Sequence, residues 1–163
     1  MDNKALYILA GYDDLTENRL AGIQNRLYDR GFTGTHTKNI PQHITLGSFP
    51  VDREQYLIDL VQRTAETTAP FTAAFNHIGI FPGGKVLFIA PDISRALLEL
   101  KEHFGGSHGW TPHTTMLIDE PDTILKALPE VIQNFSALEG TVSSLHLYEF
   151  FPTRHILSVE LKG

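Results

Sequence analysis

The sequence contains no cysteine, and this absence excludes disulfide bonds and thiolate metal sites. It suits a reducing compartment, so the expected location is the cytoplasm. Long hydrophobic runs are absent as well. The apolar stretch nearest the N-terminus, residues 5–10, is too short to span a bilayer and continues into Asp13 and Asp14 instead of a small-residue cleavage site. We therefore expect a first strand there and no association with a membrane.

The chain also lacks an excess of basic residues. It has 13 lysines and arginines against 19 aspartates and glutamates, which gives a formal net charge of -6. Proteins that hold a long nucleic-acid backbone carry the opposite balance, because their lysines and arginines neutralise phosphates. The composition therefore argues against long nucleic acid as a partner, but it allows a small anionic ligand in a local pocket.

The remaining composition is that of an ordinary globular protein. The 163 residues are 42% hydrophobic and 20% charged, and no segment is polar enough to stay unfolded on composition alone. A chain of this length can bury a core of its own. Because it has no low-complexity linker and no short-period repeat, we expect residues 1–163 to form one monomeric domain, in which two sub-lobes are allowed.

Helical and strand-like patterns alternate along the chain, which indicates an α/β or α+β domain. Residues 14–17 have the spacing of a helix capping box, and an apolar stripe follows them. Asp52 and Asp92 are expected to cap a second and a third helix. A fourth helix is expected at residues 121–135, where the internal Pro129 should kink or divide it.

Strand-like runs lie between these helices. The turn sequences at residues 82–84 and 151–154 are typical of hairpins and favour antiparallel pairing. The expected strands cover residues 4–10, 42–49, 71–81, 85–90, 113–119, 141–150 and 155–161.

Two His-x-Thr tripeptides stand out among the eight histidines. His43-Ile44-Thr45 and His113-Thr114-Thr115 both lie in apolar strand-like runs, and each has a proline just ahead of it. Because strand side chains alternate, the histidine and the threonine of each copy emerge on one face while their neighbours point into the core. The sequence therefore predicts two strands that each offer an imidazole and a hydroxyl.

This pair of units suits the chemistry of a phosphoester. Cleavage needs one proton taken from the attacking oxygen and one given to the leaving oxygen, and two histidines near neutral pH can serve as base and acid. The threonine hydroxyls of Thr45 and Thr115 can donate hydrogen bonds to non-bridging phosphate oxygens, where charge accumulates. Such a site needs no metal and no other cofactor.

Other interpretations of the histidines remain open. One His-x-Thr on a strand is common, and a structural protein could carry both copies as ordinary strand residues. A metal site is disfavoured because the sequence has no His-x-x-x-His or His-Glu-x-x-His spacing and no carboxylate close to either motif on its face. The repeat of the same pattern with the same preceding proline is what favours a shared functional site.

The two motifs resemble the signature of the two-histidine (2H) phosphoesterase superfamily, which includes bacterial 2'-5' RNA ligase-like proteins and 2',3'-cyclic nucleotide phosphodiesterases. The matching residues are His43-Ile44-Thr45-Leu46 and His113-Thr114-Thr115-Met116. The strand at residues 85–90, followed by a leucine-rich helix, is also similar to the family. The resemblance therefore extends over most of the chain.

The resemblance implies an α+β fold with two pseudo-symmetric lobes, in which antiparallel sheets flanked by helices enclose a central cleft. It implies that His43 and His113 are the acid and base, that Thr45 and Thr115 bind phosphate, and that the substrate carries a cyclic phosphate or a 2'-5' linkage. The family often has a basic residue soon after the second threonine, whereas Met116-Leu117-Ile118-Asp119 follows here. This departure weakens the inference of RNA ligation.

We expect a metal-independent hydrolase that opens a 2',3'-cyclic phosphate or a related small phosphoester at a nucleotide or RNA end, with His113 as base and His43 as acid. These two roles exchange if the reaction runs toward ligation. A nucleotide- or RNA-end-binding module with little catalysis is the alternative, and 2'-5' RNA ligase activity is another. His36, His108 and Trp110 are further candidates for lining the cleft.

Overall fold

The computed structural model of the protein describes residues 4–163. Seven strands and four α-helices follow one another along the chain, and a short 3-10 turn, η1 (Val51–Arg53), precedes the second helix. The strands are β1 (Ala5–Tyr12), β2 (His43–Phe49), β3 (Phe71–Ile80), β4 (Val86–Pro91), β5 (Thr114–Ile118), β6 (Leu138–Phe150) and β7 (Arg154–Glu160). The helices are α1 (Asp14–Asp29), α2 (Glu54–Thr67), α3 (Arg95–Glu102) and α4 (Pro121–Asn134).

All strand pairs are antiparallel, in the order β2-β1-β6-β3-β4-β5, and β7 also pairs with β6. The long strand β6 joins two lobes. Its residues 138–142 pair with β3, whereas residues 144–149 pair with β7. One lobe therefore contains β3, β4 and β5, and the other contains β2, β1 and β7. The α+β fold with two antiparallel lobes is confirmed, and its strand pairing is continuous through β6.

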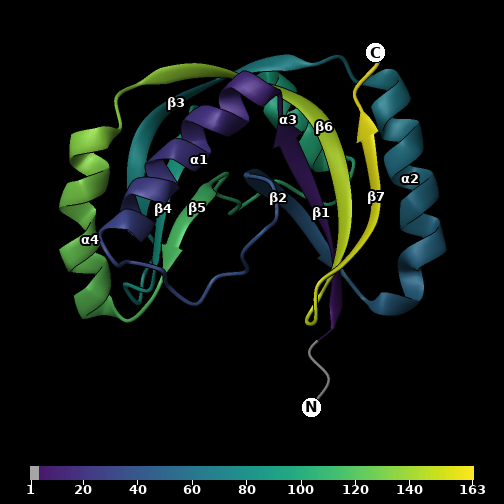
Figure 1. The fold of residues 1–163 in the computed structure, drawn as a ribbon. Coiled ribbons are helices and arrows are strands. Elements are labelled where there is room, and N and C mark those ends of the chain that lie inside the picture. The colour runs from purple at the N-terminus through teal and green to yellow at the C-terminus, as the bar shows by residue number, and fades with distance from the viewer. Residues whose placement is uncertain (1–3) are drawn as a thin grey trace.

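The helices pack on the outer sides of the two lobes (Figure 1). Helices α1 and α4 contact each other beside β4 and β5, while α2 covers β6 and β7 and α3 contacts β2. In β1 the side chains of Leu6, Ile8 and Ala10 are fully buried in the main core. The alternate residues of β1 face the other side of the sheet, between the lobes, and this side carries the site described below. Within residues 4–163 no helix is long and apolar enough to cross a membrane.

Three helix starts differ from the sequence-based expectations. The cap of α1 is Asp13, whose side chain accepts a hydrogen bond from the Thr16 amide at 3.0 Å, so the expected box at residues 14–17 is wrong by one residue. Asp52 lies inside η1, and α2 begins at Glu54 without a side-chain cap.

The cap of α3 is Ser94, which accepts from Leu97 N at 3.2 Å. Asp92 lies two residues before this cap and accepts a hydrogen bond from the Asn76 side chain at 2.6 Å.

Helix α4 runs without a break past Pro129, so the expected division is wrong. A proline in a helix leaves the carbonyl four residues earlier without its usual N–H partner. That residue here is Leu125, which is 63% exposed, so its carbonyl lies on the hydrated side of the helix. Solvation on this face removes the main reason for the helix to end.

Candidate active site

The two His-x-Thr motifs lie at the starts of strands from opposite lobes. His43 is the first residue of β2, and His113 immediately precedes β5. Although these strands are at the two ends of the strand order, the hydroxyl of Thr114 donates to the carbonyl oxygen of His43 at 3.0 Å. The same hydroxyl lies 2.6 Å from the hydroxyl of Tyr12 on β1. The fold therefore joins the two motifs directly, through buried polar contacts.

The side chains alternate as the sequence predicts. Ile44, Leu46 and Met116 are fully buried, and Thr114 is only 1% exposed. His43, His113 and the threonines at the third position of each motif, Thr45 and Thr115, are half-buried on the other face.

The two imidazoles are anchored in the same way. Nδ1 of His43 donates to the carbonyl oxygen of Pro41 at 2.8 Å, and Nδ1 of His113 donates to that of Thr111 at 2.9 Å. Because a carbonyl oxygen only accepts hydrogen bonds, Nδ1 carries the proton in each neutral ring. Each Nε2 is then the nitrogen that can take up or release a proton. The residue two positions before each histidine thus fixes both the ring orientation and the tautomer.

Burial lowers the pKa of both histidines below the ordinary value. For His43 the main cause is burial, which the hydrogen bond to the Pro41 carbonyl opposes, and the charge of His113 lowers the pKa further. Burial also lowers the pKa of His113, whose ring packs against Phe81 and Phe88 with centroids 4.7 and 5.3 Å away. The neutral imidazole is therefore favoured at both positions near pH 7.

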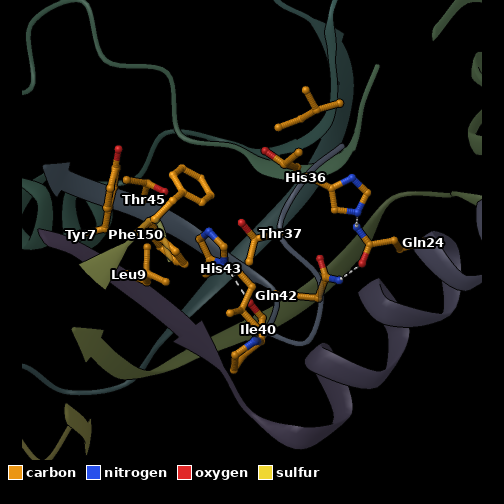
Figure 2. A pocket seen from close by; sticks show the side chains of 14 residues that line it. Tyr7, Leu9, Gln24, His36, Thr37, Ile40, Gln42, His43, Thr45 and Phe150 are labelled. Carbon is orange, nitrogen blue, oxygen red and sulfur yellow. Dashed lines mark hydrogen bonds between the residues drawn. The ribbon is translucent and has the colours of Figure 1, made fainter. Parts of the chain in front are cut away.

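A cavity of about 240 Å³ opens beside the first motif. His43 and Thr45 line it together with Thr115 of the second motif, whereas His113 is outside its wall. Figure 2 shows two different sides around His43: Tyr7, Leu9 and Phe150 lie on one side, and His36, Gln24 and Gln42 lie on the other. The full wall consists of Tyr7, Leu9, Gln24, His36, Thr37, Ile40, Pro41, Gln42, His43, Thr45, Thr115, Ile118, Phe150 and Phe151.

Of the three further candidates, the structure brings only His36 to the cavity. Its Nε2 lies 2.7 Å from the Tyr28 hydroxyl, 3.3 Å from the Gln24 amide nitrogen and 3.4 Å from the Lys38 ammonium. Amide and ammonium nitrogens only donate, so Nε2 is the acceptor. Burial, assisted by the charge of Lys38, lowers the pKa of His36 to about 4. This neutral histidine supports one wall of the cavity.

Neither His108 nor Trp110 is among the residues that line the cavity. His108 is exposed on the loop before β5. Trp110 packs against the main core, and its indole nitrogen donates to the carbonyl oxygen of Thr45 at 3.2 Å. This hydrogen bond ties the loop before β5 to the backbone of β2.

His146, which the sequence analysis did not select as a candidate, is electrostatically coupled to His43. Burial above all, and then the charges of His43 and His155, lower the pKa of His146 to about 4. His146 is bonded through Nδ1 to the Ser158 hydroxyl at 2.6 Å, and its Nε2 lies 3.3 Å from the hydroxyl of Ser144. The sequence pattern that could have identified it is the alternation along β6, because Ser144, His146, Tyr148 and Phe150 occur at every second position and so share one face of the strand.

Metal ligation is a separate possible use of such side chains. Across residues 4–163 no three His, Asp or Glu side chains converge in a way that could hold a metal ion.

Comparison with known proteins identifies a family and a set of solved structures with the same fold. The family described as the 2'-5' RNA ligase superfamily matches residues 13–150. No curated protein sequence matches the chain significantly.

Similar solved structures include Escherichia coli LigT in its apo form, with 14% identity, a TM-score of 0.64 and 98% of each chain covered. LigT complexed with 3'-AMP has 14% identity and a TM-score of 0.65 over 98% of this chain and 99% of LigT. TT0787 of Thermus thermophilus has 19% identity and a TM-score of 0.64 over 98% of both chains. At these identities the likeness establishes the fold.

Proposed function

The chain belongs to the 2'-5' RNA ligase superfamily, and we propose that it is a metal-independent phosphoesterase that opens a 2',3'-cyclic phosphate or a related small cyclic or 2'-5' phosphoester. One observation carries this proposal. Two imidazoles from opposite lobes are anchored by the same Nδ1 contact, the Thr114 hydroxyl joins their two motifs, and His43, Thr45 and Thr115 line one cavity. A pair of histidines with free Nε2 atoms is what combined base and acid catalysis requires.

The proposed step is a hydrolysis. The neutral Nε2 of one histidine takes a proton from water as the water oxygen bonds to phosphorus. The bond from phosphorus to one ribose oxygen breaks, and the protonated Nε2 of the other histidine gives its proton to that oxygen. Hydroxyls of Thr45 and Thr115 donate to the non-bridging oxygens, where negative charge grows. The product is a phosphomonoester, and solvent restores the original protonation of the two rings.

The surroundings of the two rings favour distinct roles. Burial and the neighbouring charge of His113 both disfavour the protonated form of His43, which suits a base. Burial disfavours the protonated form of His113 as well, but there the hydrogen bond to the Thr111 carbonyl opposes the shift and no neighbouring charge adds to it. We therefore assign His43 as base and His113 as acid in hydrolysis. This is the reverse of the sequence-based assignment, and the two roles exchange when the reaction runs toward ligation.

The size of the cavity supports a small substrate. About 240 Å³ is slightly below the range of roughly 300–1,000 Å³ that small-molecule sites usually have, which favours a small ligand over a long polymer. LigT, which has the same fold, has been solved with 3'-AMP, ATP, phosphate and NADP+. A bound 3'-phosphorylated nucleoside in LigT supports the same class of ligand here.

The decisive experiment is an activity screen with EDTA present. Substrates are the four nucleoside 2',3'-cyclic phosphates, ADP-ribose 1'',2''-cyclic phosphate and a 2'-5'-linked dinucleotide. We expect turnover of at least one cyclic phosphate, and a loss of about 10²-fold or more in kcat for His43→Ala and for His113→Ala. His108→Ala is the matched control, since this histidine is exposed outside the cavity.

Near-normal turnover in the double histidine variant would show that other groups catalyse the reaction. Tight binding of a nucleoside 3'-phosphate without turnover of any substrate would favour the binding module instead. A substrate with sulfur as the leaving atom separates the two roles, because a thiolate leaves without an acid. It should restore turnover to His113→Ala but not to His43→Ala.

A further inference from the structure

The cleft face of the sheet carries an apolar cluster that the acid–base chemistry does not use. Leu9, Tyr148 and Phe150 are at most 8% exposed, and Tyr7 and Ile40 pack against them. This cluster is separate from the main core, which lies on the opposite face of β1. The solvent-facing side of an antiparallel sheet normally carries polar residues. An apolar layer at this place forms the floor of the cleft.

Aromatic rings form the part of this floor that borders the cavity. The rings of Tyr7 and Phe150 have centroids 5.2 Å apart, and those of Phe150 and Phe151 are 5.5 Å apart. Phe151, at the turn between β6 and β7, is 60% exposed. A large aromatic ring that lies beside the proposed catalytic site and is open to solvent is suited to stacking against a flat ligand.

These rings are continuous with the phosphate-binding groups. Tyr7, Phe150 and Phe151 line the same cavity as Thr45 and Thr115, and Figure 2 shows Tyr7 and Phe150 beside Thr45. In a nucleoside cyclic phosphate the base is separated from the phosphate only by the ribose. A phosphate held at the threonines therefore brings the base within reach of the aromatic floor.

The opposite end of the cavity is less available to a base. The Gln42 amide nitrogen donates to Gln24 Oε1 at 2.7 Å, and the Gln24 amide nitrogen donates to the carbonyl oxygen of Met116 at 3.0 Å. His36 is bonded to the same Gln24 amide. Most of these groups are bonded to one another, although Nδ1 of His36 is buried without a partner, so fewer donors and acceptors remain at this end for reading the edge of a base.

We propose that Tyr7, Phe150 and Phe151 form a subsite that stacks the nucleobase of the substrate. The inference rests on the proposed function, since it takes the phosphate position from it. Ring faces stack on every base, so the four nucleoside 2',3'-cyclic phosphates should be turned over within about tenfold of one another. The enzyme therefore selects nucleosides over sugars that lack a base, and it does so without strong base preference.

The test compares uridine 2',3'-cyclic phosphate with methyl riboside 2',3'-cyclic phosphate, which has no base. For Phe151→Ala we expect KM for the uridine substrate to rise about tenfold with little change in kcat, while KM for the methyl riboside is unchanged. Ile93→Ala is the matched control, because Ile93 is 55% exposed and lies outside the cavity. It should alter neither substrate.

Equal effects of Phe151→Ala on both substrates, or none on either, would overturn the subsite. The subsite would also be overturned if Thr37→Val, and not Phe151→Ala, raised KM for the uridine substrate alone. If the unaltered protein turns over neither compound, the proposed function fails for these two substrates, and binding then decides the subsite. A uridine 3'-phosphate that binds no more tightly than methyl riboside 3'-phosphate would overturn it as well.

Discussion

The junction between the two motifs gives the sharpest prediction about stability. The Thr114 hydroxyl donates to the carbonyl oxygen of His43 and is bonded to the Tyr12 hydroxyl, and the side chains of Thr114 and Tyr12 are buried. Thr114→Val keeps the shape of the side chain but removes both hydrogen bonds. It leaves a buried hydroxyl and a carbonyl without these partners, which should cost about 2–4 kcal/mol of unfolding free energy.

A double-mutant cycle with Tyr12→Phe tests this reasoning. Tyr12→Phe alone should cost about 1 kcal/mol, since Thr114 can still donate to His43. In the double variant the tyrosine hydroxyl is no longer present to be left unpaired. The total should therefore fall short of the sum of the two single effects by about 1 kcal/mol.

Urea unfolding of the four proteins measures these free energies, and thermal unfolding provides a second reading. For a domain of this size, 1 kcal/mol corresponds to a shift in Tm of about 2–4 °C. Thr114→Val should therefore lower Tm by roughly 5–15 °C. It should also lower kcat by about tenfold, because the backbone of His43 loses its anchor to the second lobe. A loss below about 0.5 kcal/mol, or additivity across the cycle, would refute the argument.

Two further predictions concern pH. Because burial lowers the pKa of both His43 and His113, the base becomes competent and the acid loses its proton at a lower pH than usual. Both limbs of the kcat/KM profile should therefore lie below about pH 6.5, and an optimum above about pH 7.5 would contradict this. Stability should also fall in acid, since the pKa values of His36 and His146 are about 4 in the folded protein and near 6.5 when unfolded. The unfolded chain binds more protons between these values, so stability is complete above about pH 6.5 and is lost as pH falls toward about 4. Because both rings are partly exposed, the loss is discounted to roughly 3 kcal/mol in total. Urea unfolding between about pH 4 and 7 measures it, and His36→Gln with His146→Gln should flatten the slope.

The sequence predicted the local structure well wherever a single sequence pattern determined it. The alternation around His43 and His113 correctly predicted which side chains are buried, because strand geometry allows only two faces. The hairpin turns and antiparallel pairing followed from turn residues in the same way. Where two neighbours competed for one role, the prediction was off by one or two residues, as with Asp13 and Ser94. Tertiary contacts decided those cases, since Glu17 accepts the Gln42 amide at 2.9 Å and does not close a capping box.

The sequence by itself thus determined the repeated imidazole and hydroxyl units, the strands that carry them and the absence of thiolate chemistry. Only the tertiary structure decided what surrounds them. Tyr7, Gln42 and Phe150 come from segments far apart in the chain and meet because β1 lies between β2 and β6. The register of those pairings depends on packing summed over the whole sheet, and no local pattern encodes it. For that reason the sequence revealed the pair of histidines proposed to catalyse the reaction, and only the fold revealed the pocket beside them.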